Sequence, residues 1–317
     1  MSPLRSLGNP NFSPFDDVFS ATGKKYAIDF SPPVSWYGGR ALFMGGYSGN
    51  QNTIDYVTIT STGNASDFGD LNHATRAVAP ASNGSRGLAM GGRSSSPGPD
   101  TAVDYVTIGT TGNATDFGDS TTNAGQGYAA GSSNGTRALV AGGYGTSGTV
   151  DVEYFTIATP GNGTDLADLT VSRYGLAGCS NGDRAVFGGQ YTSGNTIDYK
   201  NFETANCTDF GDLTNGRGYI GSGQNDPAGR GFFSGGSSKD NIDYITIASA
   251  GNATNFGDAT NQEDSTSATS NATRGIIAGN ASSGNYISYI TISSTGNATD
   301  FGDLTVGRGY IGATSGD

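Results

Sequence analysis

The sequence predicts an all-β protein, a six-bladed β-propeller with four-stranded antiparallel blades. The phrase Ile-Asp-Tyr, or a close variant of it, recurs at intervals of 45 to 49 residues. Its six tyrosines are Tyr56, Tyr105, Tyr154, Tyr199, Tyr244 and Tyr289. Glycine makes up 53 of 317 residues and bounds short runs of Val, Ile, Tyr and Phe. This period and composition are typical of propeller blades, whereas a helical solenoid would repeat its apolar residues with a period of about 3.6.

The third copy of the repeat shows the four strands of a blade in order. Strand a and its turn read "GYAAGSSNG", strand b reads "TRALVAGGYG", strand c reads "VDVEYFTIATPGN" and strand d reads "TDLADLT". Glycine pairs end strand b, and Gly-Asn separates strands c and d. Gly and Asn tolerate the positive φ angles of tight turns, so this motif predicts a hairpin that recurs in every blade.

The two ends of the repeat array complement each other. The array begins at Gly39 with "GRALFMGG", a strand b without strand a, and it finishes with "GRGYIGATSGD" from Gly307, a strand a without strand b. Pairing the last strand into the first blade would close the ring and leave no open sheet edge. We therefore expect a propeller over residues 38–317, with strand a innermost and the C-terminal strand in the first blade.

The loops predict which face of the propeller binds a ligand. In such a meander the a–b and c–d turns share one face, and the b–c and d–a connections share the other. The a–b and c–d turns are uniform, whereas the segments between strands b and c vary, and variable loops on a rigid scaffold often carry recognition. The predicted ligand-binding residues on this b–c face, chosen for stacking and charged contacts to a glycan or protein, are Tyr47, Arg93, Tyr144, Gln190, Tyr191 and Lys239.

Residues 1–37 do not fit the repeat and form a predicted N-terminal arm. The arm is rich in aromatic residues, which is unusual for a disordered tail. Its predicted partner-docking residues are Phe12, Phe15, Phe19, Tyr26, Phe30 and Trp36. Either the arm packs across the propeller as a strap, or it docks on another protein; we favour docking, because the propeller closes without it.

Composition excludes several classes of function. The net charge of −12 argues against wrapping of nucleic acid, which needs clustered Lys and Arg. No apolar stretch is long enough for membrane insertion. His73 is the only histidine, so a histidine-ligated metal site or catalytic triad has little basis, and a lone loop histidine is usually solvated. Cys179 and Cys207 lie three strands apart in one blade, which predicts free thiols. We expect no cofactor and no bound metal.

Repeated charged residues have structural and chemical interpretations. Asp-x-x-Asp recurs at the start of strand d, as in Asp67 and Asp70. Paired carboxylates could serve a glycosidase or bind calcium, but repetition in nearly every blade favours structural capping. One set of arginines begins strand b, namely Arg40, Arg86, Arg137, Arg184, Arg230 and Arg274, and a second follows strand d, namely Arg76, Arg173, Arg217 and Arg308. We expect both sets to form inter-strand ion pairs rather than to bind anions.

The order of the motifs resembles the kelch repeat. Each copy has a glycine pair, then Ile-Asp-Tyr, then an aromatic residue with Leu and Arg, as in "DFGDLTVGR" from Asp300. The sequence departs from kelch blades at the position of their tryptophan, where it has Phe68, Phe117, Leu166, Phe210, Phe256 and Phe301. The phrases "TGNATDFGDLT" and "SNGTR" are more specifically similar to kelch-like propeller repeats in structural proteins of tailed bacteriophages, notably marine phages and cyanophages. This resemblance extends from Gly38 to the C-terminus.

The resemblance implies a non-enzymatic virion protein, assembled in the host cytoplasm. On this interpretation the arm binds other virion subunits, and the propeller is tail-associated and presents its variable loops to a glycan or protein of the host surface. A capsid decoration, cement or connector protein without receptor binding is an alternative. A glycan-cleaving propeller enzyme is a further alternative, but the sequence lacks a single non-repeated set of acids or nucleophiles, so no catalytic residue is predicted.

Overall fold

The computed structural model describes residues 38–316 except 95–99, 123–126, 146, 192, 204–205, 226–228 and 283. The chain divides into two units, Met1–Val34 and Ser35–Asp317, and the described residues belong to the second. The predicted arm over residues 1–37, with its docking residues, therefore lies outside the described residues. The described part contains no helix that is long and apolar enough to cross a bilayer.

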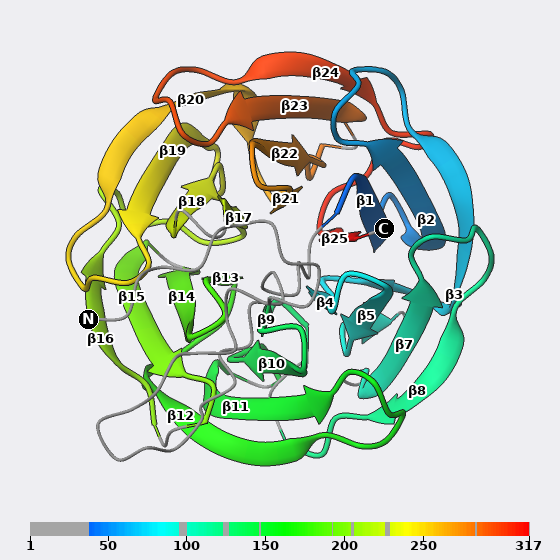
Figure 1. Cartoon of the computed structure of the whole chain (residues 1–317), viewed down its shortest axis with the longest axis horizontal. Helices are drawn as coiled ribbons and strands as arrows, with labels where there is room; N and C mark the ends of the chain where they lie inside the picture. Colours follow the sequence, from blue (N-terminus) through cyan, green and yellow to red (C-terminus); the bar gives the residue numbers. More distant parts are fainter. Residues whose placement is uncertain are drawn as a thin grey trace, which may run out of the picture. The chain divides into compact units, whose positions relative to one another are not determined.

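Six antiparallel sheets surround a central axis, which confirms the predicted six-bladed propeller (Figure 1). Blade 1 contains β25 (Gly312–Gly316), β1 (Arg40–Tyr47), β2 (Asn50–Thr58) and β3 (Ser66–Arg76), and blade 2 contains β4 (Ala79–Ser82), β5 (Arg86–Met90), β7 (Ala102–Thr107) and β8 (Thr115–Asp119). Blade 3 contains β9 (Ala130–Ser133), β10 (Arg137–Ala141), β11 (Thr149–Thr156) and β12 (Thr164–Arg173), and blade 4 contains β13 (Ala177–Ser180), β14 (Arg184–Gln190), β15 (Gly194–Asn201) and β16 (Thr208–Asp212). Blade 5 contains β17 (Gly221–Asn225), β18 (Arg230–Ser234), β19 (Lys239–Thr246) and β20 (Thr254–Glu263), and blade 6 contains β21 (Ser267–Ser270), β22 (Arg274–Ala278), β23 (Tyr286–Thr291) and β24 (Thr299–Asp303).

Strand a of each blade lies nearest the axis, and the C-terminal strand closes the ring as predicted (Figure 1). β25 pairs with β1 from Arg40 opposite Gly316 to Met44 opposite Gly312. Blade 1 also has a fifth strand, β6 (Arg93–Ser94), which pairs with the end of β3 although it belongs to the b–c segment of blade 2. This extra strand was not expected from the repeat.

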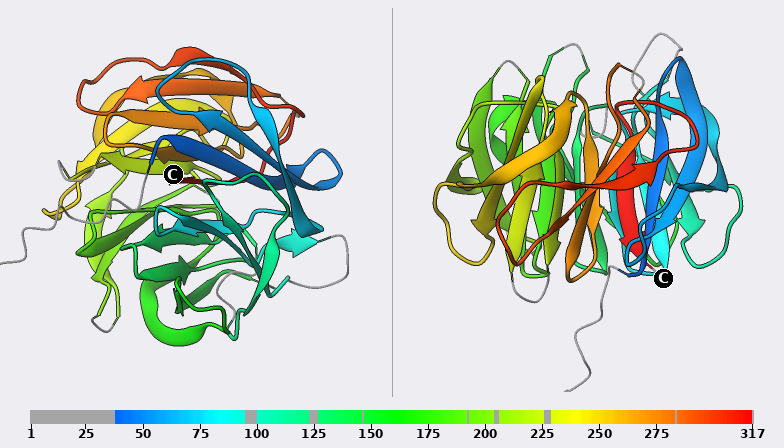
Figure 2. Two further views of the ribbon diagram at one scale, coloured as in Figure 1. Left: turned by 45° about the vertical axis from the view of Figure 1, so that its right-hand side comes forward. Right: turned by 90° about the horizontal axis from the view of Figure 1, so that it is seen from above.

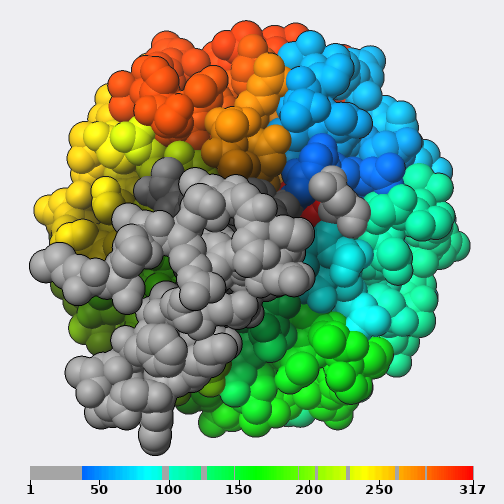
Figure 3. All heavy atoms as spheres, viewed as in Figure 1, coloured from blue at the N-terminus to red at the C-terminus, as the bar shows by residue number. Residues whose placement is uncertain are grey.

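The core lies between neighbouring blades. Phe43 of blade 1, for example, packs in one cluster with Ile276 and Phe301 of blade 6. Figure 3 shows the coloured blades following one another around the ring, with the red atoms of blade 6 beside the blue atoms of blade 1. Strand b is buried along nearly its whole length because both of its faces meet a neighbouring blade. The propeller therefore depends on contacts that no single blade can make alone.

The repeated Gly-Asn hairpin joins each blade to the one before it. Gly112 N donates to Phe68 O at 2.8 Å, and Ala114 N donates to Asp70 O at 2.7 Å. Asn113 Oδ1 accepts a hydrogen bond from the backbone N of Asp70 at 3.1 Å. We call this contact the hairpin clasp; its asparagine bond recurs at all six blade junctions. The asparagine does not adopt the expected positive φ. The repeated phrase therefore encodes an inter-blade joint as well as a turn.

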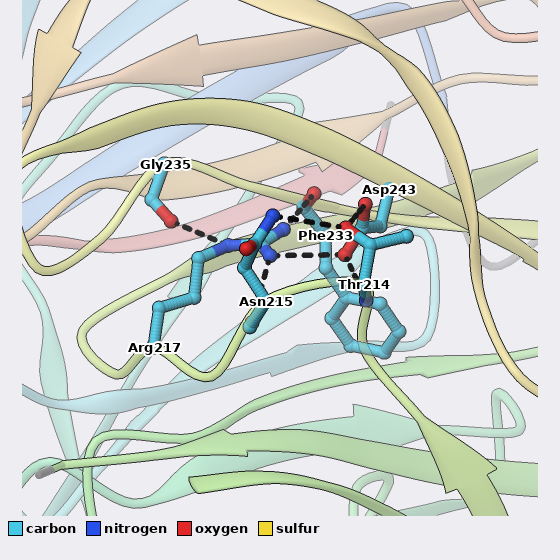
Figure 4. A network of polar contacts seen from close by, with 6 residues as sticks. All are labelled: Thr214, Asn215, Arg217, Phe233, Gly235 and Asp243. Carbon is cyan, nitrogen blue, oxygen red and sulfur yellow. Dashed lines mark hydrogen bonds and ion pairs between the residues drawn. The ribbon is translucent and has the colours of Figure 1, made fainter. Parts of the chain in front are cut away.

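Three arginines that follow strand d form fully buried ion pairs, as predicted. Their partners are aspartates in strand c of the next blade, in the pairs Arg173–Asp198, Arg217–Asp243 and Arg308–Asp55, with N···O distances of 2.8 to 2.9 Å. Figure 4 shows one of them: Arg217 also donates to Gly235 O at 2.9 Å and to Phe233 O at 3.2 Å, and Thr214 donates to the same aspartate. The junction of blades 5 and 6 lacks this ion pair. Strand c of blade 6 has Ser288 in place of the aspartate, and strand d of blade 5 has Glu263 in place of the arginine. At this junction both partners of the ion pair are absent, whereas blade 2 keeps Asp104 although blade 1 has Thr75 at the arginine position.

The arginines that begin strand b behave differently from the prediction. The guanidinium of Arg40 lies 4.7 Å from the ring centroid of Tyr56 and donates to Ile108 O of the next blade at 2.7 Å. All six arginines stack on the tyrosine of their own Ile-Asp-Tyr phrase in the same way. Within the described residues, only Arg137 has an acidic partner, the exposed Glu203 at 2.9 Å. The expected ion pairs are wrong for this set, because aromatic faces and carbonyl groups take the place of carboxylates.

His73 is a strand residue rather than the solvated loop residue that the sequence suggested. It lies in β3 with Nε2 2.5 Å from Asp100 Oδ2 and Nδ1 4.0 Å from Asp104 Oδ2. The hydrogen bond to Asp100 raises the pKa of His73 above its ordinary value, although partial burial opposes the shift. When protonated, His73 supplies positive charge beside Asp104, the strand c aspartate of blade 2.

The ion pair of His73 is expected to make stability depend on pH. Because the folded pKa is raised, the stabilisation is complete below the unfolded value of about 6.5 and is lost as pH rises through the folded value. The free energy of unfolding of the wild type, measured with urea relative to His73→Gln, should therefore fall between pH 5.5 and pH 8.5. A difference between the two proteins that stays constant over this range would contradict the assignment.

Cys179 and Cys207 are both free and buried, which confirms the prediction of free thiols. Burial raises the pKa of each thiol to about 12. Since the thiolate is the reactive form, both should react slowly with a disulfide reagent in the folded protein. Titration should find two thiols that react promptly only after denaturation; fast reaction of either in the native protein would contradict this burial.

Candidate binding face

The connections between strands project from two opposite faces of the ring (Figure 2). The b–c and d–a connections lie on one face, because β1 ends at Tyr47 where β2 begins and β3 ends at Arg76 where β4 begins. The hairpin clasps lie at the opposite ends of the same strands. We keep the name b–c face for the first of the two.

Exposed large hydrophobic side chains occur only on the b–c face within the described part of the chain. Tyr47, Tyr191 and Tyr286 lie at ends of strands b and c, and Val171 and Val306 lie at or beyond the end of strand d. Each is 40% to 47% exposed. These side chains come from different blades but share one face of the ring, so the b–c face is the candidate contact surface.

Three tyrosines converge on the axis at the centre of this face. Tyr128, Tyr219 and Tyr310 directly precede strand a in alternate blades, and their ring centroids are 5.1 to 5.4 Å apart. Their φ angles are 59°, 58° and 53°, in the left-handed region that bulky residues rarely adopt. The other blades have Ala77, Gly175 and Ser265 at the same position, also with positive φ. Small residues alternate with tyrosine because six rings could not meet at one axis.

The left-handed conformation closes a ring of backbone hydrogen bonds around the axis. Tyr128 N donates to Ala77 O at 3.0 Å, Gly175 N donates to Tyr128 O at 2.7 Å, and Tyr219 N donates to Gly175 O at 2.7 Å. At the junction where the chain closes on itself, Ala77 N donates to Tyr310 O at 2.6 Å. Below the three tyrosines, a channel of about 120 Å³ is lined mostly by small side chains of strand a. Backbone hydrogen bonds to the neighbouring blades therefore hold the residues with positive φ in place.

Further tyrosines extend this central group outward over blades 3 and 4. Tyr144 lies 4.6 Å from Tyr174 by ring centroids, Tyr174 stacks on Tyr191 at 4.9 Å, and Tyr191 lies 5.2 Å from Tyr219. We call these residues the tyrosine cluster: Tyr128, Tyr144, Tyr174, Tyr191, Tyr219 and Tyr310. It offers flat apolar ring surfaces with polar hydroxyl tips.

Burial disfavours the charged form of three phenols in the cluster. It raises the pKa of Tyr174, Tyr219 and Tyr310 above the ordinary value, and neighbouring tyrosines add to the shift in each case. Each phenol therefore stays protonated at physiological pH and can both donate and accept a hydrogen bond. Chemically, the cluster can stack and hydrogen-bond a ligand.

Two arginines border the cluster. The guanidinium of Arg93 lies 5.3 Å from the ring centroid of Tyr144, and that of Arg76 lies 4.5 Å from the ring centroid of Tyr47. Arg76 Nε also donates to the hydroxyl of Tyr128 at 3.3 Å. Arg76 thus forms no ion pair with an aspartate of the next blade, unlike the other arginines after strand d.

The structure brings together four of the six residues that the sequence singled out for ligand binding. Tyr144 and Tyr191 belong to the cluster, and Tyr47 and Arg93 lie at its border. Gln190 ends β14 beside Tyr191, and its backbone N donates to Arg217 O at 3.0 Å. Lys239 begins β19 on the same face but in blade 5. Ligand binding by all six residues stays a prediction.

The centre of the site and the role of Arg76 were not predicted from the sequence. The central residues are Tyr128, Tyr174, Tyr219 and Tyr310. A signal was present, because a tyrosine follows strand d in the phrases "QGY", "SRY", "RGY" and "RGY". Two of them, Tyr128 and Tyr310, fall in segments that the repeat predicts to be strand a. Their convergence depends on the arrangement of six blades around one axis, which the local sequence does not show.

The described residues contain no group of three or more His, Cys, Asp and Glu side chains arranged to hold a metal ion. The second aspartate of each Asp-x-x-Asp pair instead donates its backbone N to a hairpin clasp, as Asp70 does to Asn113. Comparison with known proteins found no matching family model and no matching curated protein.

Proposed function

We propose that this chain is a non-catalytic binding protein of a virion, which attaches through its b–c face to a glycan or protein of the host surface. The observation that carries the binding role is that, among the described residues, the exposed large hydrophobic side chains all lie on this face, which also carries the tyrosine cluster. The virion location rests on the resemblance of the repeats to kelch-like propellers of tailed phages. In a tail-associated position, the arm over residues 1–37 would tether the propeller to other virion subunits.

The non-catalytic assignment is supported by the way charged residues are used. Acidic residues recur at matching positions from blade to blade, and the strand c aspartates Asp55, Asp198 and Asp243 form buried ion pairs. An enzyme needs one asymmetric arrangement of acids or nucleophiles. Shortening of host-surface glycans during incubation with the purified chain would contradict this assignment.

Binding to host cells tests the role of the b–c face. The labelled full chain should bind intact host cells, and the triple variant Tyr47→Ser, Tyr191→Ser, Tyr286→Ser should bind markedly less. The matched control is Thr62→Ala with Thr111→Ala, which changes exposed hairpin residues on the opposite face. If the triple tyrosine variant bound host cells as well as the hairpin control, the contact with the host would lie outside the b–c face.

Gold-labelled antibodies against the propeller, applied to purified virus particles, test the location. Gold at the tail or its fibres would support host attachment. Gold over the capsid would contradict attachment and favour the alternative of a decoration, cement or connector protein. Particles without gold, under conditions in which the antibody detects the chain in the infected lysate, would contradict a virion role.

A further inference from the structure

Arg76 and Arg93 form a pair of like charges that the propeller fold does not require. They lie directly opposite each other in the ladder between β3 and β6. Like charges at such positions destabilise a sheet. β6 is also the one described strand that departs from the four-stranded blade pattern. This two-residue strand of the blade 2 segment pairs with β3 of blade 1 and places Arg93 beside Arg76.

Neither guanidinium has an acidic partner among the described residues. Arg76 Nη1 donates to Asn50 Oδ1 at 2.8 Å, and its other partner is the neutral hydroxyl of Tyr128. Arg93 stacks on Tyr144, and its backbone O accepts a hydrogen bond from Asn50 Nδ2 at 3.2 Å. By contrast, Arg173, Arg217 and Arg308 each meet a buried carboxylate. Two adjacent cations therefore lie on the binding face, and no described carboxylate forms an ion pair with either of them.

The surroundings of the pair suit a sugar better than a peptide or a nucleic acid. Each arginine stacks on a tyrosine, Tyr47 or Tyr144, whose flat ring and hydroxyl match the mixed apolar and polar faces of a sugar ring. Tyr47 is the exposed large side chain beside the pair, whereas peptide anchors usually fill well-packed pockets. Nucleic-acid binding depends on many phosphate contacts, which an acidic chain of net charge −12 opposes.

We propose that Arg76 and Arg93 bind the carboxylate or sulfate group of an acidic glycan whose sugar rings stack on Tyr47 and Tyr144. This inference rests on the proposed function of the b–c face and names the class of its ligand. Guanidinium groups bind such anions in planar, two-point geometry, and stacking on tyrosine holds the groups in place before the ligand arrives. The bound anion would also relieve the repulsion between the two arginines.

Direct binding to the full chain tests the proposal with defined carbohydrates. Titration calorimetry would use four acidic probes, namely hexagalacturonate, alginate oligomers, chondroitin sulfate and dextran sulfate, with maltohexaose as the neutral probe and polyglutamate as the acidic peptide. We expect at least one acidic glycan to bind and both comparison probes to fail. Binding should weaken as salt rises, because charge pairing contributes to it.

Arg93→Gln is the decisive variant. It should weaken binding of the acidic glycan by about tenfold, the loss expected for one charge-assisted contact. Arg40→Gln is the matched control, because Arg40 also stacks on a tyrosine of blade 1 but is held at the other end of the blade by Ile108 O. It should leave the affinity unchanged. In the free protein, Arg93→Gln should leave the melting temperature unchanged or raise it, which a merely structural arginine would not do.

Each other outcome overturns the proposal. Failure of all four acidic glycans to bind would do so, as would unchanged affinity in Arg93→Gln or a clear fall in its melting temperature. Equal binding of polyglutamate would indicate an acidic peptide ligand instead. The host-cell assay separates this inference from the proposed function. If Arg93→Gln binds host cells as well as the wild type while the triple tyrosine variant does not, the b–c face binds the host without an acidic glycan.

Discussion

Replacement of Arg217 by methionine is expected to lower the free energy of unfolding by about 3–5 kcal/mol, the range for breaking one partner of a buried pair. The variant would leave the Asp243 carboxylate fully buried without a cation. It would also remove donors from Gly235 O and Phe233 O. Urea unfolding followed by circular dichroism measures the loss.

Two further variants separate the ion pair from simple loss of packing. The double variant Arg217→Met, Asp243→Val should recover part of the loss, because no unpaired charge then remains buried. Arg230→Met removes a half-buried arginine that stacks on Tyr244, and it should cost only about 1 kcal/mol. If the double variant were as unstable as Arg217→Met, the buried charge would not be the cause.

The second large effect is expected for Gly302→Ala, with a loss of about 2–4 kcal/mol from backbone strain and steric conflict. Gly302 has a φ of +150°, and a Cβ there would lie 2.4 Å from Gly63 O in the hairpin clasp that joins blades 6 and 1. The clasp would have to move apart to accept it. Thermal and urea unfolding should both show the loss.

Two positions in the same chain control for the cause. Gly296 has a similar φ of +157°, but a Cβ there would meet no atom within 4 Å, so Gly296→Ala should cost clearly less. In blade 3 the equivalent residue is already an alanine, because Ala167 pairs opposite Val152 as Gly302 pairs opposite Ile287. Ala167→Gly should therefore cost at most about 1 kcal/mol. Equal losses for Gly302→Ala and Gly296→Ala would show that close contact in the clasp is unimportant.

The sequence predicted the architecture because each piece of evidence for it was local or repeated. The period gave the number of blades, and the unpaired strand at each end of the array gave the closing pair of β1 and β25. The stacking of Arg40 on Tyr56 could also have been found, because Arg40 pairs with Thr58 and so shares a sheet face with Tyr56 two residues away. Charge alone predicts ion pairs at these positions, whereas the register also shows the neighbouring aromatic ring.

The centre of the binding face could not be predicted in the same way. Tyr128, Tyr219 and Tyr310 meet only because three different blades point them at one axis. Their left-handed backbone is also not signalled by residue type, since tyrosine rarely adopts it. The approach of Arg93 to Arg76 depends on a two-residue strand that crosses between blades, which no repeat pattern indicates.

Closure of the ring by β25 has a consequence for how the chain folds. Arg308 hydrogen-bonds Asp55 across 253 residues, and β25 supplies the innermost strand of blade 1, whose other strands precede the remaining blades in the sequence. Contacts of such large sequence separation form slowly. During synthesis, one edge of β1 therefore stays unpaired until β25 has left the ribosome. This unpaired edge can pair with another chain and cause aggregation, and slow translation would lengthen the time for which it is exposed.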